Sequence, residues 1–200
     1  AGKVADQPAA AYRDEPGVAR DSATETFVAA KLYVDNWRWR GVPFYLRTGK
    51  RVAEQMSTIA IRFRYPPQLL FHDVAAGGHV DPNWVLLSIQ PVECMHMELH
   101  AKQPGLGMET RVVRLNASYR HANESPMEAY KTLLLDVIEG DRSLYLRFDE
   151  VEWAWRVVDP ILRQWSAARG DIPVYPAGSW GPEETNRLFD RKHQYWRNVL

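Results

Sequence analysis

Between residues 26 and 118 one pattern recurs: a short run of β-branched and aromatic residues, then a segment with turn-forming Gly or Pro. Such runs are typical of β-strands. In residues 57–64, Ile59, Ile61 and Phe63 alternate with other side chains and so share one face of a strand. The spacing favours antiparallel pairing, because parallel strands need long crossovers. We therefore expect antiparallel strands at about 26–35, 44–48, 57–64, 84–90, 92–101 and 110–118.

The last third of the sequence has the periodicity of helices. One helix is predicted to begin at residues 125–128, which combine an N-cap, a first-turn Pro and a capping-box Glu, and to end at Gly140. A second helix is predicted over about 149–165 from its apolar spacing, with a kink at Pro160.

Strands followed by helices indicate the α+β class, with one large, mostly antiparallel sheet and helices packed on one face. A short strand is expected at 144–148, and a last short helix is expected to start at Pro182. Residues 1–24 are interpreted as an N-terminal arm or interdomain connection without regular structure. Residues 25–200 are interpreted as the domain itself.

The composition bears on which partners and which cellular compartment to expect. With 25 basic and 25 acidic residues in 200, the net charge is zero, so neither nucleic acid nor an anionic membrane is expected as a partner. The one cysteine, Cys94, excludes an internal disulfide and suggests a reducing, cytoplasmic compartment. No apolar run approaches the roughly 20 residues of a membrane helix. The first ten residues lack the pattern of a signal peptide.

The strand predicted at 92–101 carries two candidate sites. His96, Glu98 and His100 share one face, and such a set can bind zinc. Met and Leu residues on the opposite face favour instead a polar face that is solvated or at an interface, so we expect no metal. Cys94 is not expected to act as a nucleophile, because nothing near it in the sequence is seen to activate its thiol.

The sequence has no nucleotide-binding motif. Residues 105–107, Gly-Leu-Gly, lack the third glycine of a dinucleotide fingerprint and lie between two predicted strands, so they are interpreted as a turn.

Residues 41–51 carry the most informative local pattern, an apolar strand that ends in Thr-Gly-Lys-Arg. Alternation places Lys50 on the same side as Phe44 and Leu46. Gly49 lets the backbone bend or approach a ligand closely. A lysine at the rim of an apolar face can bind an anion or a hydroxyl group. Taken alone, the pattern is more often an exposed charge at a strand end.

Residues 35–39, DNWRW, and 41–50, GVPFYLRTGK, resemble the signature stretch of the glucose-6-phosphate dehydrogenases. The resemblance continues in one register over nearly the whole chain and is closest to bacterial members. It corresponds to the C-terminal β+α domain of that family. Further matching segments are residues 22–27, 89–91, 127–136, 149–155 and 175–182.

The resemblance implies an oxidoreductase of glucose metabolism and the pentose phosphate pathway. That family oxidises glucose 6-phosphate to 6-phosphogluconolactone and passes hydride to NADP or NAD. The resemblance places the dinucleotide, the general-base His with its Asp and the segment that grips the phosphate in an N-terminal Rossmann domain, upstream of Ala1. We therefore expect this chain to supply part of the substrate site and a homodimer sheet, to hold no catalytic residue, metal or cofactor, and to be inactive alone.

Three residues carry over as expected substrate ligands. Lys50 matches the lysine that this domain contributes to binding glucose 6-phosphate. Gln55 stands where the family usually has a second basic ligand. Its neutral amide can hydrogen-bond a sugar hydroxyl but brings no charge to the phosphate. Gln90 matches a glutamine near the site.

Some eukaryotic members bind a second, structural NADP on this domain through basic residues. Arg47 matches one of those residues. Ser88 and Glu98 stand where further basic residues would be expected, so we predict no structural NADP site here. The alternative to an enzyme domain is a free-standing oligomerisation or binding module without catalysis. A Rossmann half preceding Ala1 in the encoded protein would distinguish the two.

Overall fold

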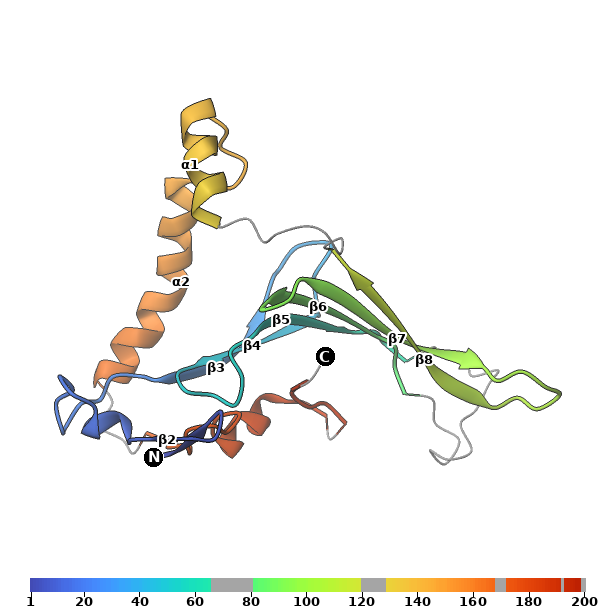
Figure 1. Ribbon diagram of the computed structural model, residues 1–200, viewed down its shortest axis with the longest axis horizontal. Helices are drawn as coiled ribbons and strands as arrows, with labels where there is room; N and C mark the ends of the chain where they lie inside the picture. The colour runs from blue at the N-terminus through green and yellow to red at the C-terminus, as the bar shows by residue number, and fades with distance from the viewer. Residues whose placement is uncertain (66–80, 120–128, 168–171, 192, 199–200) are drawn as a thin grey trace. The chain divides into compact units, whose positions relative to one another are not determined.

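The computed structural model describes residues 1–65, 81–119, 129–167, 172–191 and 193–198 (Figure 1). Its strands are β1 (Gly2–Val4), β2 (Gln7–Ala9), β3 (Phe27–Tyr33), β4 (Pro43–Gly49), β5 (Ser57–Arg62), β6 (Trp84–Gln90), β7 (Cys94–Lys102) and β8 (Thr110–Ser118). Its helices are α1 (Ala129–Glu139) and α2 (Phe148–Ala167), with 3₁₀ helices η1 (Tyr12–Asp14) and η2 (Glu183–Leu188).

The α+β class with antiparallel sheets is confirmed. Every named strand pairs antiparallel with its neighbour in sequence. Hydrogen bonding divides the strands into a two-stranded sheet β1–β2, a two-stranded sheet β3–β4 and a four-stranded sheet β5–β6–β7–β8. The expected single sheet is thus three hydrogen-bonded sheets in the described part of the chain.

The chain forms two compact units. The first comprises Ala1–Arg20, Glu25–His121 and Val174–Leu200, and holds all three sheets. The second comprises Asp21–Thr24 and Ala122–Pro173, and holds α1 and α2. Helices packed on one face of the sheet stay a prediction.

One face of the four-stranded sheet is covered and forms the core of the first unit. On β6, Trp84, Leu86 and Ser88 are only 7%, 1% and 3% exposed. The register places Glu98 opposite Trp84, and His96 opposite Leu86. We call this surface the covered face; it comprises Thr58, Ala60, Arg62, Trp84, Leu86, Ser88, Cys94, His96, Glu98, His100, Arg114 and Asn116.

The opposite face of the same sheet is apolar. Ile59, Ile61, Ile89 and Leu115 are each 44–51% exposed. We call this surface the apolar face; it comprises Ile59, Ile61, Val85, Leu87, Ile89, Met95, Met97, Val113 and Leu115. Of the two alternatives for the His96–Glu98–His100 side of β7, a solvated face or an interface, the structure excludes the solvated one. The C-terminal segment lies against this side, where Arg197 contacts Glu98 and Trp84.

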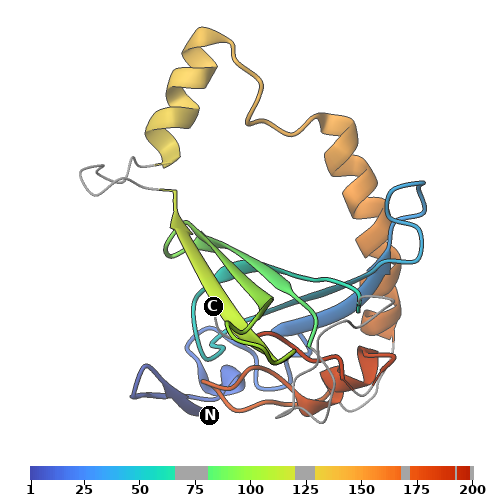
Figure 2. The same ribbon diagram turned by 90° about the vertical axis from the view of Figure 1, so that its right-hand side faces the viewer.

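The extended segment after η2 joins two of the sheets. Its odd-numbered residues contact the covered face: the rings of Tyr195 and Trp84 lie 5.8 Å apart, and the Arg197 guanidinium lies 5.5 Å from the Trp84 ring. An even-numbered residue, Trp196, stacks on Arg47 of β4. This alternation is that of an extended strand-like segment between two surfaces. The segment is red in Figure 2.

Two local expectations change. The short strand expected at 144–148 is wrong, because Ser143–Tyr145 form a turn in which Asp141 Oδ1 accepts hydrogen bonds from the Ser143 backbone N–H and hydroxyl. Residues 1–24, expected without regular structure, contain β1, β2 and η1. Ala5 and Asp6 both have positive φ, at 47° and 61°, as the two central residues of a type I′ hairpin turn require.

The other expected strands and the second helix are confirmed to within a few residues, and α1 ends next to Gly140 as expected. The cap predicted at residues 125–128 lies outside the described residues. α2 continues through Pro160 for 20 residues, and its kink stays a prediction. The last short helix is the 3₁₀ helix η2. Among the residues described, no helix is both long enough and apolar enough to cross a membrane.

Candidate functional site

Lys50 directly follows β4, and its backbone is held on both sides. Its N–H donates to the carbonyl of Thr26 at 2.8 Å. The Tyr175 hydroxyl lies 2.7 Å from the Lys50 carbonyl and 3.0 Å from that of Thr26, so its proton bridges the two chain segments. The Lys50 side chain is exposed, and no hydrogen bond or ion pair joins it to any residue that the structure describes. The ammonium group is therefore available to a ligand.

The residues after Lys50 are also anchored. Arg51 has a φ of 50°, a left-handed conformation that is rare for residues other than glycine. Its carbonyl accepts a hydrogen bond from the Gly178 N–H at 2.8 Å, and its guanidinium lies 2.7 Å from a carboxylate oxygen of Glu15. Ala53 N–H donates to the Ser179 carbonyl at 3.0 Å. These bonds fix the base of the Lys50 side chain before any ligand arrives, which reduces the entropy lost on binding.

Gly49 has a packing role that the sequence did not indicate. A Cβ at Gly49 would lie 2.4 Å from the Phe27 ring, and one at Gly181 would lie 2.3 Å from the same ring. The Phe27 and Tyr175 rings meet edge to face at 5.3 Å. Two glycines thus make room for Phe27, and Phe27 supports the tyrosine that bridges Lys50.

Gln55 and Gln90 lie at neighbouring strand ends. Gln55 is exposed in the connection that leads from Lys50 to β5. Gln90 is the exposed last residue of β6 and pairs in register with Ser57, the first residue of β5. The fold thus brings Gln90 to the end of β5 that Gln55 precedes, with Lys50 at the start of the same connection. Within the described part of the chain, no hydrogen bond links the three side chains.

Arg47 is occupied by packing. Its guanidinium lies 5.0 Å from the Trp180 ring and 4.9 Å from the Trp196 ring, and it donates to Asn198 Oδ1 at 2.5 Å. Burial lowers the pKa of Arg47 from its ordinary value. The side chain is therefore a structural cation between two indoles.

Glu98 is bound by two arginines. Its carboxylate lies 3.1 Å from Arg114 of β8 and 2.8 Å from Arg197, and its side chain is 17% exposed. Burial alone would raise the pKa of Glu98, but the hydrogen bonds and charges of both arginines outweigh it and hold the pKa below its ordinary value. Glu98 thus ties the C-terminal segment to the covered face.

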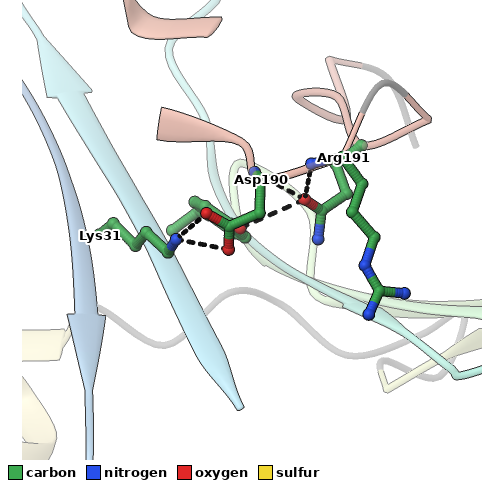
Figure 3. A network of polar contacts seen from close by, with 5 residues as sticks. Lys31, Asp190 and Arg191 are labelled. Atoms are coloured by element: carbon green, nitrogen blue, oxygen red, sulfur yellow. Dashed lines mark hydrogen bonds and ion pairs between the residues drawn. The ribbon is translucent and has the colours of Figure 1, made fainter. Parts of the chain in front are cut away.

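A second polar network joins the same segment to β3 and β4 (Figure 3). The Lys31 ammonium lies 2.5 Å from both carboxylate oxygens of Asp190. The Gln194 side-chain oxygen accepts from the backbone N–H groups of Asp190 and Arg191 at 3.0 Å each. Tyr45 donates to the same oxygen at 3.4 Å. The hydrogen bond to Asp190 raises the pKa of Lys31, so the amine stays charged.

Two of the three residues considered for a metal have other partners, whereas the buried Nδ1 of His100 has no hydrogen-bond partner among the described residues. His96 contacts Cys94 and Asn116, and Glu98 contacts its two arginines. In the residues described, no three His, Cys, Asp or Glu side chains are placed to hold one metal ion.

The contact between Cys94 and His96 is one that the sequence reasoning missed. Cys94 Sγ lies 3.1 Å from His96 Nε2, and His96 Nδ1 lies 2.6 Å from Asn116 Oδ1. A Cys-x-His pair in one strand shares a face, so the pair itself could have been predicted. Asn116 comes from β8 and depends on strand pairing.

The turn at Gly105–Gly107 is confirmed, since these residues connect β7 to β8 and Lys102 donates to the Gly105 carbonyl at 2.7 Å. The glycines thus stand between two antiparallel strands rather than before a helix. That geometry does not fit a dinucleotide phosphate, which needs a glycine-rich turn at a helix N-terminus.

Comparison with known proteins agrees with the geometry. A family model described as "Glucose-6-phosphate dehydrogenase, C-terminal domain" matches residues 1–197. The chain belongs to this family. Glucose-6-phosphate 1-dehydrogenase of Mycolicibacterium smegmatis is 43% identical over 98% of the chain and 39% of its own length. The enzyme of the same name from Treponema pallidum is 40% identical over 99% of the chain and 39% of its own length.

Solved structures give the same result. A glucose-6-phosphate dehydrogenase in complex with its substrate glucose 6-phosphate superposes with a TM-score of 0.81, at 32% identity, over 94% of this chain and 38% of that one. Glucose-6-phosphate 1-dehydrogenase from Mycobacterium avium superposes with a TM-score of 0.78, at 32% identity, over the whole chain and 40% of its own. The chain thus spans about two-fifths of the length of these relatives.

Proposed function

We propose that this chain is the substrate-site and assembly domain of a glucose-6-phosphate dehydrogenase. The whole enzyme oxidises glucose 6-phosphate to 6-phosphogluconolactone with NADP or NAD as hydride acceptor, as an oxidoreductase of the pentose phosphate pathway. The nucleotide and the base that takes the C1 hydroxyl proton belong to residues outside these 200. The single free cysteine supports a reducing, cytoplasmic location.

The observation that carries the proposal is Lys50. The backbone around it is held by Thr26, Tyr175 and Gly178, whereas its ammonium group is exposed and unbound within the described structure. A flexible lysine on a rigid base suits an anionic or hydroxylated ligand such as a sugar phosphate. Lys50 would orient the sugar from one wall of the cleft, and its charge would favour the phosphate.

Gln55 and Gln90 are proposed as further contacts to the sugar. Both side chains are exposed. Gln55 lies in the connection from Lys50 to β5, and Gln90 lies at the end of β6 that pairs with the start of β5. Their amides can donate to and accept from hydroxyl groups without adding charge. Phosphate binding by this domain then rests on Lys50.

The test is the steady-state kinetics of the full-length enzyme with Lys50→Gln. Loss of a charge-assisted hydrogen bond of about 1.5–3 kcal/mol raises KM for glucose 6-phosphate, or lowers kcat/KM, by roughly 10- to 150-fold. Lys3→Gln is the matched control, because Lys3 is an exposed lysine of the same unit. Unchanged kinetics in Lys50→Gln would refute the site, and an inactive wild type would favour the non-catalytic binding module.

The same assay on the 200-residue chain should show no dehydrogenase activity. None of the described residues forms the glycine-rich turn at a helix N-terminus that a dinucleotide requires. Turnover by the chain alone would contradict the assignment of the nucleotide to another part of the enzyme.

We also propose a homodimer through the four-stranded sheet. Nine apolar side chains from all four strands form the apolar face, and several of them are about half exposed. Such a patch is typical of interaction surfaces, and the cores of homodimer interfaces are similarly apolar.

A further inference from the structure

Cys94 lies at the start of β7 on the covered face, and its thiol contacts an imidazole. Two acceptors are near its Sγ: His96 Nε2 at 3.1 Å and the Val92 carbonyl at 3.7 Å. On the far side of the ring, His96 Nδ1 lies 2.6 Å from Asn116 Oδ1. An amide oxygen only accepts, so this contact assigns the ring proton to Nδ1 and leaves the Nε2 lone pair facing the thiol.

The residue paired with Cys94 across the sheet carries a buried hydroxyl. The register places Ser88 of β6 directly opposite Cys94 on the covered face, so that the two Cβ atoms are about 5 Å apart. Ser88 is only 3% exposed, and its Oγ has no hydrogen-bond partner among the described residues. Thr58, opposite Ser88 on β5, also has a buried and unpartnered hydroxyl.

An unpartnered buried hydroxyl calls for an explanation, because it costs free energy without giving a hydrogen bond. A group attached to Cys94 Sγ would face Ser88 across the strand pair. An oxygen there could accept the hydrogen bond that Ser88 does not make in the reduced protein. The covered face thus holds both a base for the thiol and a donor for an oxygen bound to its sulfur.

We propose that Cys94 is a site of oxidation by hydroperoxides, with His96 as the base that activates its thiol. His96 Nε2 takes the thiol proton, and the thiolate attacks the distal peroxide oxygen. The S–O bond forms as the O–O bond breaks, so sulfur is oxidised to the sulfenic acid and the peroxide is reduced to an alcohol or water. His96 returns the proton to the leaving oxygen. The net change is Cys–SH plus ROOH to Cys–SOH plus ROH.

The surroundings of the site suit a small, neutral oxidant. Cys94 is partly exposed. A hollow of about 160 Å³ lies along the neighbouring strands, lined by Leu86, His96, Met97, Glu98, Arg114 and Asn116. The Glu98 charge is already paired with Arg114 and Arg197, so no unpaired carboxylate of that set faces the thiolate. The hollow borders the activating His96 rather than the thiol itself, and the oxidants used in the test are hydrogen peroxide and small alkyl hydroperoxides.

The test measures Cys94 in the full-length protein by mass spectrometry of the peptide that contains it. At pH 7, alkylation by iodoacetamide should be at least about tenfold faster than that of glutathione, as expected for a thiol with an adjacent base. After hydrogen peroxide, dimedone should trap the sulfenic acid at Cys94. His96→Gln should reduce both reactions to the level of glutathione. His100→Gln is the matched control on the same face and strand, and should leave both unchanged.

Two variants of Asn116 test the same proposal if circular dichroism shows that His96→Gln does not fold. Asn116→Ala should slow both reactions because the ring loses its fixed tautomer, whereas Asn116→Asp should retain them because a carboxylate still accepts from Nδ1. Ser88→Ala should shorten the lifetime of the sulfenic acid without changing the alkylation rate. Wild-type Cys94 that reacts no faster than glutathione, or variants of His96 and Asn116 that react like wild type, would overturn the proposal.

Discussion

At the scale of single residues, Lys50 combines a backbone held by hydrogen bonds with an exposed side chain. The backbone of Lys50 is bonded to Thr26 and Tyr175, and its side chain projects without a partner among the described residues. A ligand that meets such a side chain need not reorganise the loop below it. The residues that support the loop should therefore affect binding more than they affect the chemical step.

Tyr175→Phe tests this argument. The substitution removes the hydroxyl that bridges the Lys50 and Thr26 carbonyls but keeps the ring contact with Phe27. We expect KM for glucose 6-phosphate to rise several-fold while kcat changes little, since one neutral hydrogen bond contributes about 1 kcal/mol. Tyr12→Phe, in η1, is the control. Equal losses in kcat and kcat/KM would show that Tyr175 does more than support the loop.

Glu98 makes a pH-dependent contribution to stability. Because its pKa is lowered in the folded protein, its contribution is fully present above its ordinary pKa of 4.5 and is lost as the pH falls through the lower folded value. The groups that face it are Arg114 and Arg197, with His96 and His100 on the same face of β7.

Glu98→Gln should therefore be less stable at pH 7 by about 1–3 kcal/mol, the contribution of hydrogen bonds between charged groups. The difference from wild type should shrink as the pH falls below the ordinary pKa of 4.5 and through the lower folded value. Urea denaturation of both proteins at a series of pH values measures this difference. A difference that does not depend on pH would show that Glu98 stabilises by packing alone.

At the scale of elements, helix α2 contains a residue that destabilises helices. Pro160 lies inside the 20-residue helix, where it cannot donate a backbone hydrogen bond and its ring crowds the preceding turn. The flanking residues have enough helical preference and apolar spacing to continue the helix past it.

Pro160→Ala should raise the stability of α2 by as much as about 3 kcal/mol. Hydrogen exchange of the α2 amides and the thermal unfolding midpoint measure the change. Asp159→Asn is the control, since it removes the charge of an exposed contact with Arg163 at 3.9 Å and leaves the helix propensity nearly unchanged. Slower exchange in both variants would mean that the proline has no special effect.

At the scale of the whole molecule, the proposed dimer depends on the apolar face. Ile61 and Leu115 lie on this face in β5 and β8, and are 44% and 50% exposed. A charge at either position would have to be buried against the second copy, at a cost of several kcal/mol.

Ile61→Glu and Leu115→Glu should therefore each convert the full-length homodimer to a folded monomer, measured by sedimentation velocity at micromolar concentration. Leu106→Glu is the control, because Leu106 is fully exposed in the turn between β7 and β8 and lies off the apolar face. A dimer that survives both substitutions would move the contact to another surface.

The sequence by itself determined the family and most of the strands and helices after residue 25, but not β1, β2 or the turn at Ser143–Tyr145. The alternation from Ile59 onward, the apolar spacing of α1 and the Gly-Lys sequence at the end of β4 are local patterns, and each depends on residues within a few positions of one another. The resemblance to the family, rather than the local pattern alone, assigned Lys50 as a candidate ligand, because a charged strand end by itself is more often a solvated side chain.

Only the tertiary structure decided which face of the sheet is covered, and which side chains meet. The alternation of side chains in β7 is the same whichever face is buried. Strand pairing places His96 and Glu98 beside the buried Leu86 and Trp84 of β6, and so determines which face of β7 is covered. His96 meets Asn116 across 20 residues, and Arg47 meets Asn198 across 151. Contacts at such separations arise because burial of apolar area and pairing of backbone groups bring distant segments together, and no local pattern encodes them.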